Sequence, residues 1–264
     1  MSPALKLHVL PPSHPCKAAI AALEIKELDY ELVELAPGPH VAEMESVYGE
    51  GNKTVPGLLV DDEPVHGSRA IIARLEELEP EPTLYPAEIR EEVLEAERWG
   101  DEELQDLGRR MPWGSMHFRP EALGTFGGPG PLDAAGTDFA MRLIHGTWRY
   151  HGISCELIAS DLAGLPEKLE RIDEFAAAGT IGGVRGLAAD LQIGSTIRVL
   201  LCVGDLLPLL EGTTAERIVE PICRSAAFGV SPPIVPAAAN SSIRSSFSGR
   251  PARSEAISSQ LIPW

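Results

Sequence analysis

The sequence is short of cysteine, and its cysteines are scattered. The four cysteines are Cys16, Cys155, Cys202 and Cys223. They form no CxxC pair, which argues against a disulfide framework and a cysteine zinc site and is typical of a reducing compartment. The seven histidines show no spacing typical of metal ligands. We therefore expect a cytoplasmic protein that binds no metal.

Long apolar runs and positive charge are also scarce. No apolar run reaches the roughly 18 residues that span a membrane, and the opening MSPALKLHVL lacks the apolar core of a signal peptide. Lys and Arg number 22 against 39 Asp and Glu, for a net charge of −17. Such a surface repels the phosphates of nucleic acids and anionic lipids, so we expect neither nucleic acid nor a membrane as a partner.

The first 80 residues alternate between strand and helix patterns. In LKLHVL (residues 5–10) apolar and polar residues alternate, which predicts a strand. In PCKAAIAAL the apolar residues recur at helical spacing, which predicts a helix that begins close to Ser13. The other elements expected here are a strand at residues 30–35, a helix at 41–47, paired strands at 54–60 and 63–66, and a helix at 67–78 with Ser68 as its N-cap.

The order of these elements predicts two domains. Residues 1–80 give βαβ, α, ββα, which is an α+β domain with a mixed four-stranded sheet and helices on its faces. Residues 86–230 are helical in pattern and predict an all-α domain, with a glycine-rich break at 124–136. Residues 231–264 are rich in Ser, Pro and Ala, and we expect an extended or disordered tail; the alternative is a tail that packs back on the body.

Three short motifs follow one another in the first domain: SHPCKAAIAAL, TVPGL and GSRAI. They resemble the start of the first helix, the Val-Pro signature before the third strand, and the (Glu/Asp)-Ser-x-Ala-Ile motif of glutathione transferases. Each motif is weak alone, but the three in this order are specific. The resemblance extends over residues 5–228, and Asp190 in AADLQI resembles the family's buried capping aspartate. It implies a thioredoxin-like domain, an all-helical domain and a serine-type active site.

The resemblance also implies an activity and roles for residues. A homodimeric, detoxifying transferase would conjugate glutathione, or a related thiol, to a small apolar electrophile, with glutathione as a co-substrate and no other cofactor. Ser13 would hold the sulfur as a thiolate, which a helix N-terminus favours. The backbone of Val55, before a cis Pro56, would pair with the cysteinyl part of glutathione. Ser68 would bind the γ-glutamyl carboxylate, and Lys53 and Thr54 would lie near the glycyl carboxylate.

The sequence departs from the family pattern at Gly67, where most members carry an acidic residue that meets the γ-glutamyl ammonium. Loss of such a charged hydrogen bond costs about 1.5–3 kcal/mol. Asp61, Asp62 or an acidic residue of a second subunit would compensate, or the protein would use a different thiol.

Several alternatives stay open. Cys16 is interpreted as a small packed residue. Two alternative functions of the protein are a thiol–disulfide oxidoreductase that uses Cys16 and a non-catalytic binding or scaffold protein. Met111, Trp113 and Met116 are either the wall of an electrophile pocket or part of the core. His14 is expected to face solvent.

Overall fold

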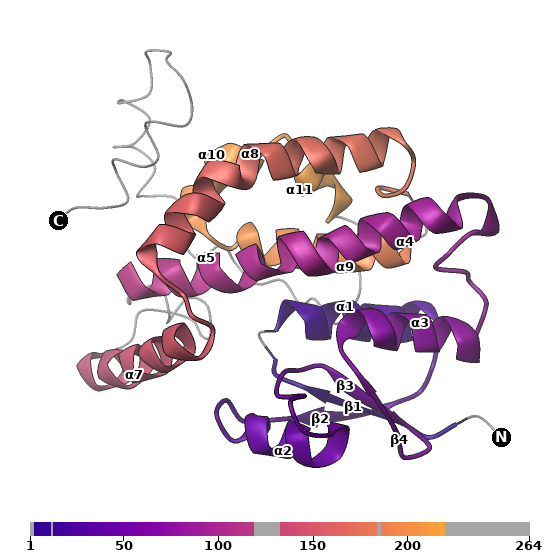
Figure 1. The fold of residues 1–264 in the computed structure, drawn as a ribbon, viewed down its shortest axis with the longest axis horizontal. Helices are drawn as coiled ribbons and strands as arrows, with labels where there is room; N and C mark the ends of the chain where they lie inside the picture. Colours follow the sequence, from indigo (N-terminus) through magenta and orange to yellow (C-terminus); the bar gives the residue numbers. More distant parts are fainter. Residues whose placement is uncertain (1–2, 12, 119–132, 184–185, 220–264) are drawn as a thin grey trace. The chain divides into compact units, whose positions relative to one another are not determined.

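The computed structural model describes residues 3–11, 13–118, 133–183 and 186–219. This part of the chain forms two compact units (Figure 1). The first is drawn from the described residues of Met1–Gln105, Asp173–Arg198 and Thr214–Val230, and the second from those of Asp106–Ile172 and Val199–Thr213. The predicted domain boundaries stay predictions. The predicted tail and most of the predicted glycine-rich break lie outside the described residues.

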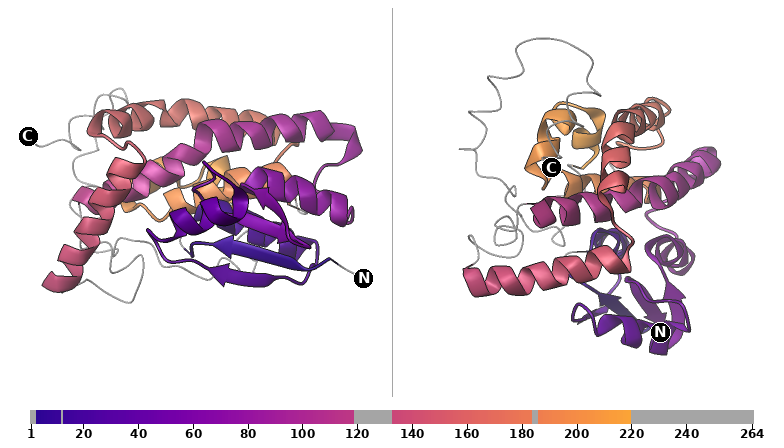
Figure 2. Two further views of the ribbon diagram at one scale, coloured as in Figure 1. Left: turned by 60° about the horizontal axis from the view of Figure 1, so that its bottom comes forward. Right: turned by 60° about the vertical axis from the view of Figure 1, so that its left-hand side comes forward.

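Four strands form one mixed sheet, as the sequence predicts (Figure 1, Figure 2). They are β1 (Leu5–Val9), β2 (Glu31–Glu34), β3 (Gly57–Val60) and β4 (Glu63–His66), in the order β2-β1-β3-β4. β1 and β2 are parallel, whereas β1–β3 and β3–β4 are antiparallel. A turn of two residues joins β3 to β4, and both of them, Asp61 and Asp62, have positive φ, as tight hairpins require.

Helices cover both faces of the sheet. α1 (His14–Ile25) and α3 (Ser68–Leu78) lie side by side on one face, and α2 (His40–Tyr48) lies on the other (Figure 1). His8 faces α2, because its ring is 2.6 Å from the Tyr48 hydroxyl. Side chains alternate along a strand, so Leu7 points to α1 and α3. Leu7 is fully buried, and burial of one such leucine contributes about 1.5–3 kcal/mol.

The rest of the described chain is helical, which confirms the predicted fold class. Its elements are η1 (Ala87–Ile89), α4 (Arg90–Trp99), a π-helical segment η2 (Gly100–Leu104), α5 (Gln105–Phe118), α7 (Ala134–Tyr150), α8 (Cys155–Ala177), α9 (Ala188–Leu200), η4 (Gly204–Leu206), α10 (Leu207–Leu210) and α11 (Thr214–Ile218). In this described part, no single helix has both the length and the hydropathy to cross a membrane. α9 and Gly204–Leu210, taken together as one bent pair, meet the criteria of length and composition only.

α9 is a buried, largely apolar helix, as the sequence predicts. Leu191, Ile193 and Ile197 expose at most 1% of their surface. Asp190 on the same helix accepts hydrogen bonds from the backbone N–H groups of Leu187 (2.8 Å) and Gly182 (2.6 Å). Burial raises the pKa of this carboxyl, and the two N–H donors lower it. Asp190 therefore ties the loop before α9 to the helix, a folding role and not a catalytic one.

Candidate functional site

Three segments of the first unit meet at one end of the sheet. In the strand register, Gly57 at the start of β3 pairs with His8 on β1 and with His66 on β4. β1 and β4 run toward this end and β3 runs away from it. The residues after β1, before β3 and after β4 therefore lie close together, and we call this place the shared end. It carries Ser13, Val55 and Ser68, and both α1 and α3 begin there.

Ser13 is the N-cap of α1, where the sequence places it. Its backbone is extended, its N–H donates to the carbonyl of Leu10 (3.0 Å), and its carbonyl accepts from the N–H of Lys17 (3.2 Å). The hydroxyl does not cap the helix. It is instead hydrogen-bonded to the thiol of Cys16. A half-buried hydroxyl therefore stands at the positive end of the helix dipole.

Cys16 is a packed residue, which supports the interpretation favoured from the sequence. It exposes 1% of its surface. Burial raises the pKa of the thiol to about 11, more than the hydrogen bond from Ser13 lowers it. A thiol of this kind is a poor nucleophile at neutral pH, because the thiolate is the reactive form. The expectation for His14 was wrong: it exposes 8% of its surface, because the first turn of α1 packs into the unit.

The segment before β3 is held from two sides. The Val55–Pro56 peptide bond is cis, as the resemblance implies. The carbonyl of Pro56 accepts from the N–H of Gly67 (3.0 Å), and the carbonyl of Thr54 accepts from Nε2 of His66 (2.7 Å). The strand begins at Gly57 and not at Thr54 as predicted, since Pro56 has no N–H for a sheet bond.

Gly57 allows an aromatic ring to lie on the start of β3. A Cβ at this position would lie 2.3 Å from the Tyr48 ring, closer than two carbons can approach. The same ring is anchored by the contact of its hydroxyl with His8. Tyr48 therefore supports the shared end from the α2 side.

At the start of α3, the N-cap is Gly67 and not Ser68 as predicted, and Ser68 is the first helical residue. Gly67 has a φ of +92°, which residues other than glycine rarely adopt. This backbone favours a glycine over the acid that the resemblance implies. Ser68 exposes 3% of its surface, and its hydroxyl donates to Oε1 of Gln192 on α9 at 3.0 Å.

Two further predicted positions need comment. Lys53 is exposed and lies 3.5 Å from Glu45 on α2, so its ammonium is already in an ion pair. Met111 and Met116 on α5 expose 5% and 1% of their surface, which supports the core interpretation. Trp113 on the same helix is half-buried, and its carbonyl accepts from the indole N–H of Trp148 on α7 (3.2 Å). These three residues belong to the second unit.

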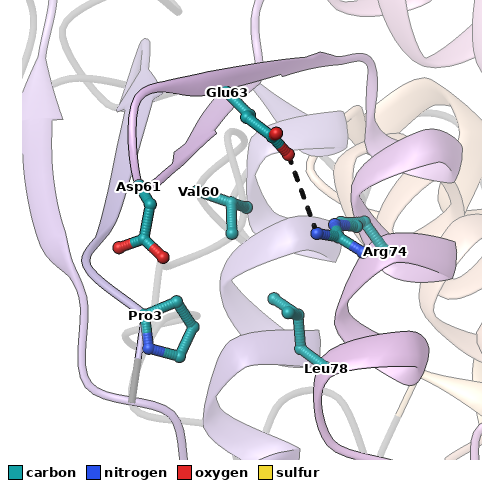
Figure 3. A pocket seen from close by; sticks show the side chains of 6 residues that line it. All are labelled: Pro3, Val60, Asp61, Glu63, Arg74 and Leu78. Carbon is teal, nitrogen blue, oxygen red and sulfur yellow. Dashed lines mark ion pairs between the residues drawn. The ribbon is translucent and has the colours of Figure 1, made fainter. Parts of the chain in front are cut away.

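A cavity of about 290 Å³ lies at the opposite end of the sheet from the shared end (Figure 3). It opens beside the β3–β4 turn, where Val60 ends β3 and Glu63 begins β4. Glu63 and Arg74 lie 3.9 Å apart across it. The lining residues are Pro3, Val60, Asp61, Glu63, Arg74 and Leu78. It contains none of the predicted site residues except Asp61, which was expected to compensate for Gly67 and which the β3–β4 turn places at the end of the sheet opposite to Gly67. Among the described residues, no group of three or more His, Cys, Asp or Glu side chains is arranged to hold a metal ion.

Comparison with known protein families gives a match to the region that contains the shared end. The family profile "Glutathione S-transferase, N-terminal domain" matches residues 7–83, which contain all three segments of the shared end. Glutathione S-transferase 1 of Manduca sexta is 30% identical over 156 residues, which are 54% of this chain and 66% of that protein's length. Both comparisons support membership of the glutathione S-transferase family. The match spans just under two thirds of that relative.

Solved structures share the fold over most of the chain. The beta-etherase LigF from Sphingobium sp. strain SYK-6 has a TM-score of 0.62 at 20% identity and covers 86% of this chain and 97% of its own. A glutathione S-transferase from Rhodospirillum rubrum F11 has a TM-score of 0.56 at 20% identity and covers 88% and 96%. At these identities the likeness concerns the fold alone.

Sequence reasoning missed the polar groups behind the start of α3. Glu97 on α4 exposes 1% of its surface, accepts from the Tyr85 hydroxyl (2.8 Å) and lies 3.8 Å from Nε of Arg69. Burial raises its pKa to about 7, although the hydrogen bond from Tyr85 and the charge of Arg69 lower it. One signal was available: Glu97 follows Val93 by four residues, which places it on the same, buried face of the helix.

Proposed function

We propose that the chain is a glutathione transferase: it binds reduced glutathione at the shared end and joins its sulfur to a small apolar electrophile. The observation that carries the proposal is the meeting of Ser13, Val55 and Ser68 at one end of the sheet. The family profile matches this same region. A further structure with this fold is a rice glutathione transferase in complex with glutathione, at a TM-score of 0.54 and 17% identity.

The geometry supports a division of labour among the three residues. Val55 lies before β3, where an extended peptide adds to the sheet through backbone hydrogen bonds. Ser68 begins α3, whose first N–H groups and dipole favour a carboxylate. Ser13 begins α1, so its hydroxyl and the helix dipole favour a thiolate over a thiol.

In the reaction the glutathione thiol first releases its proton to water. The sulfur lone pair then forms a carbon–sulfur bond with the electrophile, and the leaving group departs with its electron pair. The nucleophile is the ligand's own sulfur, so Cys16 takes no part. The homodimer and the cytoplasmic location implied by the resemblance are included in this proposal.

The test is calorimetric titration of the protein with reduced glutathione, followed by a conjugation assay with a chloronitrobenzene. The proposal expects binding with a dissociation constant below about 10 mM and formation of the thioether product above the uncatalysed rate. No binding and no product, with the protein folded by circular dichroism, would overturn it. Binding without product for a panel of electrophiles would leave a thiol-binding protein and overturn the transferase.

A further inference from the structure

His66, the last residue of β4, holds the backbone of the segment that precedes β3. Nε2 of its ring lies 2.7 Å from the carbonyl oxygen of Thr54. A carbonyl oxygen only accepts hydrogen bonds, so Nε2 must carry a proton and donate it. Both residues belong to the first unit. The imidazole therefore fixes the backbone at the residue directly before Val55.

Packing sets the orientation of this ring. The ring of Tyr48 lies beside it, with the two centroids 6.0 Å apart. Tyr48 is itself held by its hydroxyl, which lies 2.6 Å from Nδ1 of His8. The side chain of Val55 packs against the buried cluster that contains Tyr48. A donor whose ring is held by its neighbours keeps its partner in one place, as the support of a functional site requires.

The hydrogen bond to Thr54 also determines where the N–H of Val55 points. The C=O of Thr54 and the N–H of Val55 belong to one peptide unit, and this unit is trans, unlike the next one. A trans peptide unit is planar, and its C=O and N–H point in opposite directions. Because His66 holds the C=O, the N–H of Val55 points away from His66. In the described part of the chain, no backbone carbonyl accepts from this N–H.

The direction away from β4 leads to the start of α1, because β3 lies between β1 and β4 in the sheet. The carbonyl of Pro56 is also held from the β4 side, by the N–H of Gly67 at 3.0 Å. The N–H of Val55 is thus offered on the β1 side, where the chain leaves β1 and reaches Ser13. An extended peptide that pairs with this N–H must supply a carbonyl oxygen.

We propose that His66 is a positioning residue of the thiol site: by donating to the carbonyl of Thr54, it fixes the plane of the Thr54–Val55 peptide and aims the N–H of Val55 at the cysteinyl carbonyl of the bound thiol peptide. His66 acts through the backbone and not on the sulfur. The arrangement selects thiols that carry a carbonyl group at this position over simple alkyl thiols. This inference rests on the proposed function.

The experiment compares two ligands by calorimetry. One is reduced glutathione, and the other is its analogue in which a trans carbon–carbon double bond replaces the cysteinyl–glycyl amide. The double bond keeps the shape of the amide and removes the carbonyl that Val55 would reach. It also removes the glycyl N–H, but this loss is the same for every protein tested. The ratio of the two affinities therefore reports the contact with Val55.

The proteins are the wild type, two variants of His66 and one control. His66→Leu replaces the ring by a side chain of similar size without a donor, whereas His66→Gln restores an N–H donor in place of Nε2. The control Thr83→Val removes a different side-chain hydrogen bond of the first unit, in which the Thr83 hydroxyl donates to Glu76 at 2.6 Å, beyond the other end of α3.

The wild type, His66→Gln and Thr83→Val are expected to bind glutathione about tenfold more tightly than the analogue. In His66→Leu the ratio is expected to fall to about twofold, with the affinity for the analogue nearly unchanged. A loss of packing alone would weaken both ligands together and leave the ratio as it was, which would overturn the inference. The same fall in His66→Gln as in His66→Leu would also overturn it, because the donor would then not be the cause.

A second measurement needs no variant and applies even if His66→Leu does not fold. The ¹⁵N chemical shifts of a histidine ring distinguish a protonated nitrogen from an unprotonated one. The inference expects a protonated Nε2 in His66 of the wild type, and an unprotonated Nε2 would overturn it.

The two proposals fail in different ways. If the wild type binds neither ligand, the proposed function is overturned and this inference falls with it. If the wild type binds both ligands equally, the proposed function stands and the inference about His66 is overturned.

Discussion

α1 and α3 begin at the same end of the sheet, and each has a serine at or beside its first residue. The partners of the two hydroxyls differ. Ser13 is hydrogen-bonded to the thiol of Cys16, which keeps its own proton at neutral pH because its pKa is about 11. Ser68 faces an amide oxygen, which has no proton to give. Ser13 therefore donates to a weak acceptor, the neutral thiol of Cys16, whereas Ser68 donates to an amide oxygen, which is a strong one.

In the proposed site, one residue type is expected to serve opposite ends of a ligand. Because the two sites share a helix N-terminus, we expect the role of each serine to follow from its hydrogen-bond partner. The four predictions below test this difference, from the largest expected effect to the smallest.

Substitution Gly57→Ala is expected to disturb both helix starts at once. The new methyl would lie 2.3 Å from the Tyr48 ring, which His8 holds in place. Overpacking of this kind costs about 3 kcal/mol of unfolding free energy. Urea denaturation measures it, with Gly164→Ala on α8 as the control, because a Cβ there has no neighbour within 4 Å. A change no more destabilising than that of the control would show that the ring does not support the shared end.

Substitutions Ser13→Ala and Ser68→Ala are expected to affect different kinetic constants. Loss of the donor to the thiolate should lower kcat for conjugation about a hundredfold and leave KM for glutathione nearly unchanged, whereas Ser68→Ala should raise KM. The control is Ser154→Ala, which removes a hydroxyl that accepts from the N–H of Leu157 in the second unit. Equal effects of Ser13→Ala and Ser68→Ala on kcat would contradict the difference drawn between them.

Substitution Glu97→Gln is expected to change how the free energy of unfolding depends on pH, through one carboxyl group behind the start of α3. Burial raises the pKa of Glu97 from 4.5 to about 7 in the folded protein. Between these values the folded state binds more protons than the unfolded state, so wild-type stability falls as the pH rises. The wild type should lose about 2 kcal/mol relative to Glu97→Gln between about pH 5 and about pH 7.5. Parallel stability curves for the two proteins would contradict the raised pKa.

The smallest effect is expected for the alkylation of Cys16. With a pKa of about 11, only about one thiol in ten thousand is ionised at pH 7. Iodoacetamide should therefore label Cys155, which is partly exposed, before it labels Cys16. Mass spectrometry of the folded protein measures the order of labelling. Preferential labelling of Cys16, or a mixed disulfide on it after incubation with oxidised glutathione, would favour the oxidoreductase alternative.

The sequence predicted those parts of the fold that depend on local pattern. Alternation in residues 5–10 and helical spacing after Ser13 predicted β1 and α1, and the three motifs together predicted the segments that meet at the shared end. Boundaries moved by one to three residues, because Pro56 delays β3 and Gly67 takes the N-cap of α3.

The parts that could not be predicted depend on tertiary contacts. Ser68 and Gln192 are 124 positions apart, and nothing in either local pattern shows that they touch. Glu97 looks like one more acidic residue in an acidic helix, and only the packing of α4 buries it. His14 was expected in solvent for the same reason: a turn residue shows no sign in the sequence of what packs over it.

The central claim is that a thiol peptide binds at the shared end. NMR titration of the ¹⁵N-labelled protein with reduced glutathione tests it most directly, because each backbone amide reports its own surroundings. The account predicts that the largest shifts fall on the amides of Ser13, Val55 and Ser68. Shifts confined to the cavity beside Glu63 and Arg74 at the opposite end of the sheet, or no shifts at about 10 mM ligand, would contradict it.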